Sequence, residues 1–176
     1  MRIIAGEKRG ATIAAPPGLD TRPTADRVRE AAFNLIGPVD GATVLDLFAG
    51  SGALGLEALS RGAASVTFVE SDRAACRVIS ENLAKLRLTG ARVVCADAVW
   101  TLRQDTRTYD LVLVDPPYGE WEALQAKLEE PLARVLAPHG LLVVETGSRT
   151  TPDLPLALRT SRRYGSARLT LFEHPS

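Results

Sequence analysis

Short apolar and β-branched runs alternate with helical patterns between residues 43 and 145, and this alternation limits the possible folds more than any other feature of the chain. Strands are predicted at the apolar runs, over residues 43–48, 65–69, 91–95, 109–114 and 140–145. Helices are predicted where apolar side chains recur every three or four residues, over residues 53–61, 73–86, 98–104 and 122–137. Apolar strands joined by helices form parallel sheets that are covered on both faces. The sequence therefore predicts an α/β fold.

The N-terminal segment follows a different pattern. Residues 1–23 are rich in glycine, proline and arginine, which predicts a short hairpin or extended arm followed by a loop. A helix is predicted over residues 24–36, because Thr24 can cap its start and Gly37-Pro38 can end it.

The C-terminal segment is also distinct. Residues 156–160 and 168–172 are predicted to form an antiparallel hairpin that turns through residues 162–165. We therefore divide the chain into an N-terminal arm, residues 1–23, and one larger domain, residues 24–176.

The composition excludes several classes of protein. The chain has 176 residues, of which 45% are hydrophobic and 24% charged, as in a single globular domain. No apolar run approaches the ~18 residues of a membrane span, and the start lacks a signal-peptide pattern, so we expect a cytoplasmic protein. Two cysteines and two histidines are too few for a disulfide framework or a zinc site, so we expect no metal. The net charge is zero, yet both ends are basic and the middle is acidic, which leaves a nucleic-acid role open.

A glycine-rich loop follows the first predicted strand. In sheets of this type, ligands bind beyond the carboxyl ends of the strands, where the strand order reverses. At that place Gly50, Gly52 and Gly55 form the pattern G-x-G-x-x-G. Glycines allow a tight turn and a close approach of the backbone to a ligand, and the next helix points its free N–H groups to the same place. The pattern is typical of nucleoside sites, although a simple strand-to-helix turn also explains it.

Three carboxylates lie at or near the ends of the first three strands. Glu70 comes 20 residues after Gly50 and can accept both ribose hydroxyls of an adenine nucleoside. Asp97 can accept from an adenine amino group or cap the short helix that follows it. These positions fit NAD or S-adenosylmethionine. Asp46 favours S-adenosylmethionine, because a carboxylate before the glycine loop suits a cationic sulfonium ligand and opposes a pyrophosphate.

The loop Asp115-Pro116-Pro117-Tyr118 follows the fourth strand and suits methylation of an exocyclic amine on a base. Such an amine is a poor nucleophile, because its lone pair is delocalised into the ring. Asp115 and the Pro116 carbonyl can each accept one N–H, which steers the nitrogen toward tetrahedral geometry, and Tyr118 can stack on the base. The two prolines stiffen the loop and remove donors. Positioning and electrostatics then provide most of the catalysis, with a sulfonium as leaving group.

The glycine loop, the strand-end acids and the Asp115–Tyr118 loop resemble the class I S-adenosylmethionine-dependent methyltransferases that modify amino groups. The N-terminal segment is similar to that of RsmD-type enzymes at Arg2-Ile3-Ile4-Ala5-Gly6, Arg9-Gly10, Arg22-Pro23-Thr24-Ala25-Asp26-Arg27-Val28-Arg29-Glu30 and Phe33-Asn34. RsmD-type enzymes methylate the N2 amine of a guanine, guanine 966, in bacterial 16S ribosomal RNA. The resemblance covers residues 1–146.

The resemblance implies a Rossmann-like, seven-stranded and mostly parallel sheet whose last strand pair is antiparallel. It implies S-adenosyl-L-methionine as cofactor, S-adenosyl-L-homocysteine as its product, and a cofactor site formed by Asp46, Phe48, Ala49, Gly50, Ser51, Gly52, Glu70, Ser71, Asp97 and Ala98. The catalytic residues that would hold the guanine are Asp115, Pro116, Pro117 and Tyr118. RNA contacts are expected from Arg2, Lys8, Arg9, Arg22, Arg27 and Arg29. The expected partners are 16S rRNA in the assembled or assembling small ribosomal subunit and ribosomal proteins, with the chain acting as a monomer away from membranes.

Three other functions stay open at this point. An amino-methyltransferase acting on adenine N6 or cytosine N4, in another RNA or in DNA, would use the same four residues of the Asp115–Tyr118 loop. An NAD-dependent oxidoreductase would explain the glycine pattern, but Asp46 and the Asp115–Tyr118 loop both speak against it. A non-catalytic RNA-binding or assembly factor on the same fold would not need the loop intact.

Overall fold

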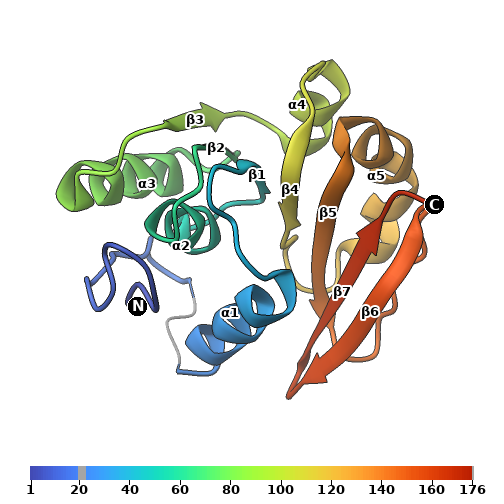
Figure 1. Ribbon diagram of the computed structural model, residues 1–176, viewed down its shortest axis with the longest axis horizontal. Coiled ribbons are helices and arrows are strands. Elements are labelled where there is room, and N and C mark those ends of the chain that lie inside the picture. Colours follow the sequence, from blue (N-terminus) through green and yellow to red (C-terminus); the bar gives the residue numbers. More distant parts are fainter. Residues whose placement is uncertain (20–22, 176) are drawn as a thin grey trace.

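A seven-stranded sheet runs through the centre of the computed structural model, which describes residues 1–19 and 23–175 (Figure 1). The strands are β1 (Thr43–Leu47), β2 (Ser65–Glu70), β3 (Ala91–Cys95), β4 (Tyr109–Val114), β5 (Leu136–Gly147), β6 (Ala157–Tyr164) and β7 (Ala167–Glu173). Their order across the sheet is β3-β2-β1-β4-β5-β7-β6, and β1 to β5 are parallel. β7 runs antiparallel to both β5 and β6. The α/β class and the terminal antiparallel hairpin are therefore confirmed.

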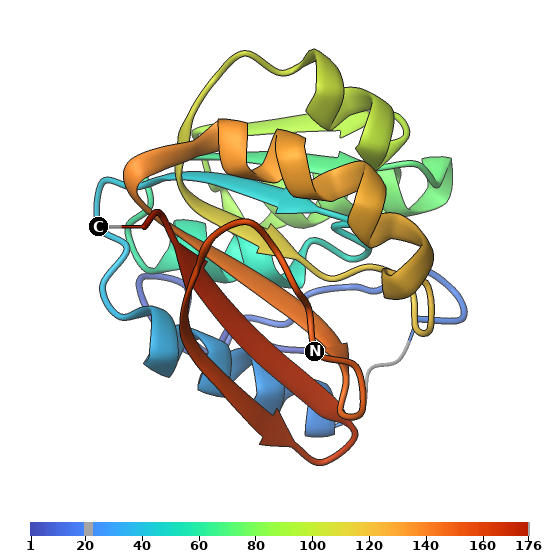
Figure 2. The same cartoon turned by 90° about the vertical axis from the view of Figure 1, so that its right-hand side faces the viewer.

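Helices cover both faces of the sheet (Figure 2). They are α1 (Pro23–Ile36), α2 (Ala53–Ser60), α3 (Arg73–Leu86), α4 (Ala98–Gln104) and α5 (Trp121–Val135). α1, α2 and α3 pack on one face, where the buried cluster includes Phe33, Leu56 and Ile79. α4 and α5 pack on the other face around Leu102, Leu128 and Leu132. Side chains buried on both faces explain why the central strands read as continuous apolar runs.

The strand order reverses between β1 and β4. From β1 the chain proceeds outward through β2 and β3, and it then returns to place β4 on the other side of β1. Leu47 pairs with Val114 in register, and the Asp115 amide donates to the Leu47 carbonyl at 3.4 Å. The loops that follow β1 and β4 therefore start side by side, at the kind of crevice where open α/β sheets bind ligands.

The N-terminal arm is a hairpin that packs into the protein core. Arg2 and Thr12 form an antiparallel bridge, and Ile3 and Ile13 are only 1% and 2% exposed. Glu57 of α2, which is fully buried, accepts from the amides of Ile4 and Ala5, each at 2.9 Å. The arm is thus fixed to the domain by apolar burial and by a buried carboxylate.

Arg29 contradicts its expected role in RNA contact. Its side chain is 4% exposed, and its guanidinium donates to Asp26 at 3.0 Å and to the Arg2 carbonyl. Its Nε lies 3.7 Å from the Glu57 carboxylate. Arg29 therefore neutralises a buried acid and joins α1 to the arm, and RNA cannot reach it in this position.

The largest differences from the predicted element boundaries lie at the start of β5 and in the C-terminal hairpin. The helix expected to reach residue 137 ends at Val135, and β5 begins at the next residue, where Leu136 adopts an extended conformation. The C-terminal hairpin turns at Gly165-Ser166, so residues 162–164 lie in β6 and not in the turn. Gly165 has a φ of 60° there, a left-handed conformation that favours glycine.

None of the helices within the described ranges is both long and apolar enough to cross a membrane.

Candidate active site

The glycine loop between β1 and α2 has a strained backbone. Phe48, Gly50 and Gly52 have φ values of 59°, 57° and 80°, and Phe48 pays a steric cost for this conformation that glycine does not. A Cβ at Gly55 would lie 2.3 Å from Cε1 of Phe68, so the third glycine allows α2 to pack closely on the sheet. The first two glycines thus shape the loop, and the third serves packing.

Asp46 lies beneath this loop and not on its surface. It is 1% exposed, and its Oδ2 accepts from the Gly55 amide in the first turn of α2 at 2.9 Å. Burial raises the pKa of Asp46 to about 8, with smaller contributions from the charges of Asp115 and Glu70 and an opposing effect of the Gly55 amide. The carboxyl therefore already uses a donor at the helix start that a pyrophosphate would need, which speaks against a dinucleotide.

Glu70 is already held in place at the end of β2. Its Oε2 accepts from the Gly50 amide and its Oε1 from the Asp72 amide, each at 2.8 Å. Each carboxylate oxygen can accept a second hydrogen bond, so Glu70 can still receive hydroxyl donors. The structure thus links the second strand end directly to the glycine loop.

Asp97 caps α4, which is one of the two roles that the sequence allowed. Its Oδ1 accepts from the Trp100 amide at 2.8 Å, and its side chain is exposed at the end of the loop after β3. Its contact with an adenine amino group stays a prediction.

The other residues of the predicted cofactor site differ in exposure. Phe48 and Ala49 are half-buried in the loop, and Ser71 is exposed beside Glu70. Ser51 and Ala98 are buried, and the Ser51 hydroxyl lies 4.0 Å from Sδ of Met1, on the inner side of the loop. Ser51 can therefore offer a ligand its backbone more readily than its hydroxyl.

The Asp115–Tyr118 loop leaves β4 directly beside the glycine loop. The Pro117 carbonyl accepts from the Glu120 amide at 3.1 Å, which closes a turn. Within the described residues, no hydrogen bond reaches the Pro116 carbonyl, so it is available to a donor. Tyr118 is 91% exposed, and its ring lies against Gly147.

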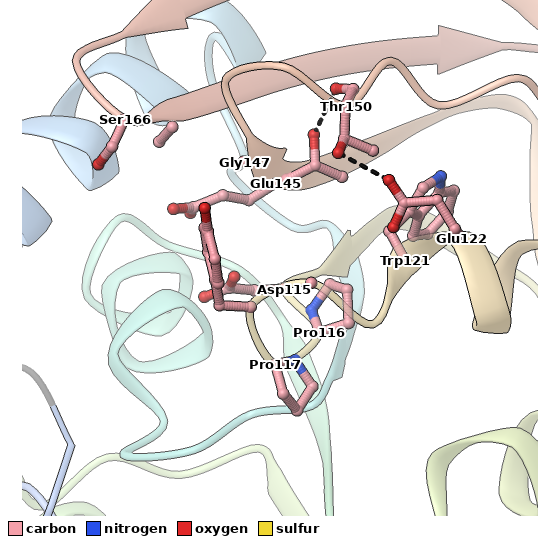
Figure 3. Close-up of a pocket in the computed structure, with 13 residues that line it drawn as sticks. Asp115, Pro116, Pro117, Trp121, Glu122, Glu145, Gly147, Thr150 and Ser166 are labelled. Carbon is pink, nitrogen blue, oxygen red and sulfur yellow. Dashed lines mark hydrogen bonds between the residues drawn. The ribbon is translucent and has the colours of Figure 1, made fainter.

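A pocket of about 190 Å³ opens between this loop and the end of β5 (Figure 3). Asp115, Tyr118 and Glu145 are among its lining residues. Partial enclosure by protein raises the pKa of Asp115 to about 7. Loss of solvation, and then the charge of Asp115, raise the pKa of Glu145 to about 8. The pocket therefore contains two interacting carboxyls with unusually high proton affinity, a common property of functional sites.

Glu145 is not among the site residues predicted from the sequence, although the sequence contains a signal for it. Glu145 follows the apolar run Leu141–Val144 in β5, at the same sheet edge as Glu70, Asp97 and Asp115. Extending the strand-end rule to the fifth strand would have identified it.

The residues expected to touch RNA lie in different environments. Arg2, Arg9 and Arg27 are exposed. Lys8 pairs with Glu7 at 2.6 Å and its side chain is 23% exposed. Arg22 lies outside the described residues. Because Arg29 is buried, the predicted RNA contact depends mainly on the exposed Arg2, Arg9 and Arg27.

Comparison with known proteins agrees with this geometry. A family model described as "Conserved hypothetical protein 95" matches residues 1–173. The chain is 50% identical over 152 residues to the Escherichia coli K12 protein named "Ribosomal RNA small subunit methyltransferase D", covering 83% of this chain and 74% of that one. It is 42% identical over 152 residues to the Bacillus subtilis "Putative rRNA methyltransferase YlbH", covering 82% of each.

A solved structure is similar over almost the whole chain. The "Putative methyltransferase yhhF" from Escherichia coli superposes with a TM-score of 0.88 and 40% identity, covering 99% of this chain and 97% of that one. The chain therefore belongs to the "Conserved hypothetical protein 95" family, that of the RsmD-type S-adenosylmethionine-dependent methyltransferases.

Proposed function

We propose that the chain transfers a methyl group from S-adenosylmethionine to the exocyclic N2 amine of a guanine in 16S rRNA of the small ribosomal subunit. One observation carries this proposal: Asp115 and an available Pro116 carbonyl stand beside the glycine loop, where the strand order reverses. A relative that is 50% identical over 152 residues is named for this class of substrate.

The acceptor loop supplies the positioning that the reaction needs. Asp115 accepts one hydrogen of the amine and the Pro116 carbonyl accepts the other, so that the nitrogen lone pair turns out of conjugation with the ring. Pro116 is buried and Pro117 closes a turn, which keeps this carbonyl in place. Tyr118 offers an exposed ring on which the base can stack. Holding the amine in an attacking geometry is a large part of the barrier reduction in such transfers.

The residues of the adjoining site fit S-adenosylmethionine. Glu70 is the ribose acceptor, Gly50 and Gly52 let the ligand approach the backbone, and Asp97 lies at the adenine end. The charges of Asp115 and Glu70 help to raise the pKa of Asp46, and a cationic ligand would offset this repulsion among the three acids. When bound, S-adenosylmethionine supplies the methyl group and a neutral thioether leaving group.

The RNA partner is expected to reach the site across the exposed arginines of the arm and α1. Arg2, Arg9 and Arg27 are available for phosphates, whereas the chain as a whole has no net charge. A neutral protein gains little non-specific affinity for RNA, so we propose that the substrate is a preassembled particle whose shape and ribosomal proteins add contacts.

The test uses small ribosomal subunits that lack the modification. They are incubated with the protein and S-adenosylmethionine, digested, and analysed for nucleosides by mass spectrometry. N2-methylguanosine that forms with the wild type, and not with Asp115→Ala, would support both the reaction and the substrate. Formation of N6-methyladenosine or N4-methylcytosine would instead favour an amino-methyltransferase of different base specificity. An absence of any product, despite measurable cofactor binding, would contradict the substrate proposal.

A further inference from the structure

Glu145 is a pocket carboxylate to which the reaction described above gives no role. We propose that Glu145 selects the base, by accepting the N1–H of the target guanine while Asp115 and the Pro116 carbonyl hold its N2 amine. This inference rests on the proposed function and names the residue that would restrict it to guanine. Glu145 is therefore a specificity-determining residue and does not itself take part in methyl transfer.

The sheet register places Glu145 beside Asp115. Val114 of β4 pairs with Val144 of β5, so that Asp115 and Glu145 are the next residues on two neighbouring parallel strands. Such strands lie about 4.8 Å apart. Both residues line the pocket, and Figure 3 shows their side chains entering it from the two adjacent strands. A base whose amine meets Asp115 therefore presents the neighbouring part of its edge to Glu145.

Gly147 lets the Tyr118 ring lie close to β5. A Cβ at Gly147 would lie 3.3 Å from Cε2 of Tyr118, so the tyrosine ring rests on a wall without a side chain. Glu145 lies two residues before Gly147 in β5. A base that stacks on Tyr118 therefore lies close to β5, the strand that carries Glu145.

Of the three bases with an exocyclic amine, guanine is the one whose neighbouring ring nitrogen can donate a hydrogen bond to a carboxylate. Next to its exocyclic amine, guanine carries an N1–H donor. Adenine carries the N1 acceptor, and cytosine the N3 acceptor, at the equivalent place. An ionised carboxylate beside the amine therefore forms a hydrogen bond with guanine and repels the lone pair of the other two bases, whereas a protonated carboxyl can donate to that lone pair. Because the pKa of Glu145 is raised to about 8, the preference for guanine should be measured above pH 8. A site built to receive a donor rejects analogues that lack it, because its own polar group is left unpaired.

The interaction between the two carboxyls strengthens this preference. The charge of Asp115 raises the pKa of Glu145, which shows that a second negative charge is unfavourable in the free pocket. N–H donors from the base offset that repulsion, whereas an acceptor increases it. Guanine brings one N2 hydrogen to Asp115 and the N1–H to Glu145, whereas adenine and cytosine can bring this pair an amine hydrogen only.

The experiment pairs a base analogue with a variant. The full-length protein and S-adenosylmethionine act on small subunits whose target nucleotide is either guanine or 2-aminopurine, introduced by ligation of a synthetic oligonucleotide. 2-Aminopurine keeps the amine but has an acceptor at N1. We expect the wild type to prefer guanine by about 10- to 100-fold in kcat/KM, the range of one charge-assisted hydrogen bond. In Glu145→Gln this preference should fall to within about 3-fold, because the amide can accept from one base and donate to the other.

Glu122→Gln is the matched control. Glu122 lines the same pocket but accepts from the Thr150 hydroxyl at 2.9 Å, and its substitution is the same exchange of a carboxyl for an amide. It should retain the wild-type preference for guanine. A similar loss of preference in both variants would mean that the overall charge of the pocket reads the base, and would overturn the inference.

The remaining outcomes separate this inference from the proposed function. Equal transfer to the two bases by the wild type would overturn the role of Glu145 without any variant. An unchanged preference in Glu145→Gln, with S-adenosylmethionine affinity intact, would do the same. In both cases N2-methylguanosine still forms and the proposed function stands. A wild type that modifies no guanine would refute the proposed function and this inference together.

Discussion

The attachment of the N-terminal arm depends on one buried carboxylate, and replacing Glu57 by alanine should destabilise the whole protein. Glu57 accepts from the amides of Ile4 and Ala5, pairs with Arg61 at 2.8 Å and lies 3.7 Å from the buried Arg29. Its loss leaves the two backbone donors without their acceptor and removes the carboxylate that neutralises Arg29 on its Nε side, although Arg29 keeps Asp26 and the Arg2 carbonyl. Removing one partner of a buried ion pair costs about 3–5 kcal/mol, and the unpaired amides add to this in a partly overlapping way. We therefore expect a loss of about 4 kcal/mol in the free energy of unfolding.

Urea unfolding, followed by far-UV circular dichroism and by the fluorescence of the buried Trp121, measures this loss. Amide hydrogen exchange at Ile4 and Ala5 should also become faster. Glu130→Ala is the control, because Glu130 is 77% exposed and pairs with Arg134 on the surface at 3.6 Å. That change should cost less than about 1 kcal/mol. A Glu57→Ala protein within about 1 kcal/mol of the wild type would refute the argument that this carboxylate fixes the arm.

Four further predictions concern the site. Asp115→Ala should lower kcat at least about 100-fold while leaving the dissociation constant of S-adenosylmethionine within about 2-fold, as turnover assays and calorimetry would show. Glu70→Ala should instead weaken cofactor binding about 10- to 100-fold by calorimetry, because two ribose hydroxyls lose a charged acceptor. Since the pKa of Asp115 is raised to about 7 and its ionised form accepts the amine hydrogen, kcat/KM should fall below pH 7, and a flat profile from pH 5 to 8 would contradict this role. The pKa of Asp46 rises from 3.8 to about 8 on folding, so the folded protein loses stability as the pH rises through this range. Asp46→Asn should therefore be more stable than the wild type at pH 8, by at most about 5 kcal/mol, but not at pH 4. Urea titrations at pH 4 and pH 8 would measure this difference.

Local signals were sufficient to predict the order of the elements. The apolar runs of β1, β2 and β4 are buried on both faces, and α3 begins at the cap Asp72 and carries the apolar face that its spacing predicted. The boundary between α5 and β5 was misplaced because the chain passes from helix to strand at Val135–Leu136 without a glycine or proline between them. Turn residues mark most boundaries in a sequence, and this one has none.

The candidate site could be predicted in part for a similar reason. Gly50, Glu70 and Asp115 each lie at or just beyond the end of a strand, and a rule about strand ends finds such residues without knowledge of contacts. The roles of Arg29 and Glu57 could not be predicted in this way, since they depend on contacts between residues far apart in the sequence. Arg29 lies within a motif rich in arginine, and only its position against Glu57 distinguishes it from the exposed Arg27.

The pairing of β1 with β4 also has an evolutionary consequence. The distance between the donor half of the site and the acceptor half is set by the hydrogen bonds of the backbone ladder, from Val44–Leu111 to Leu47–Val114. Side-chain substitutions in the pocket leave this spacing unchanged, so acceptor preference can diverge while the transfer geometry is inherited. The sheet thus separates two properties that selection would otherwise have to change together: how the methyl group is transferred and which molecule receives it.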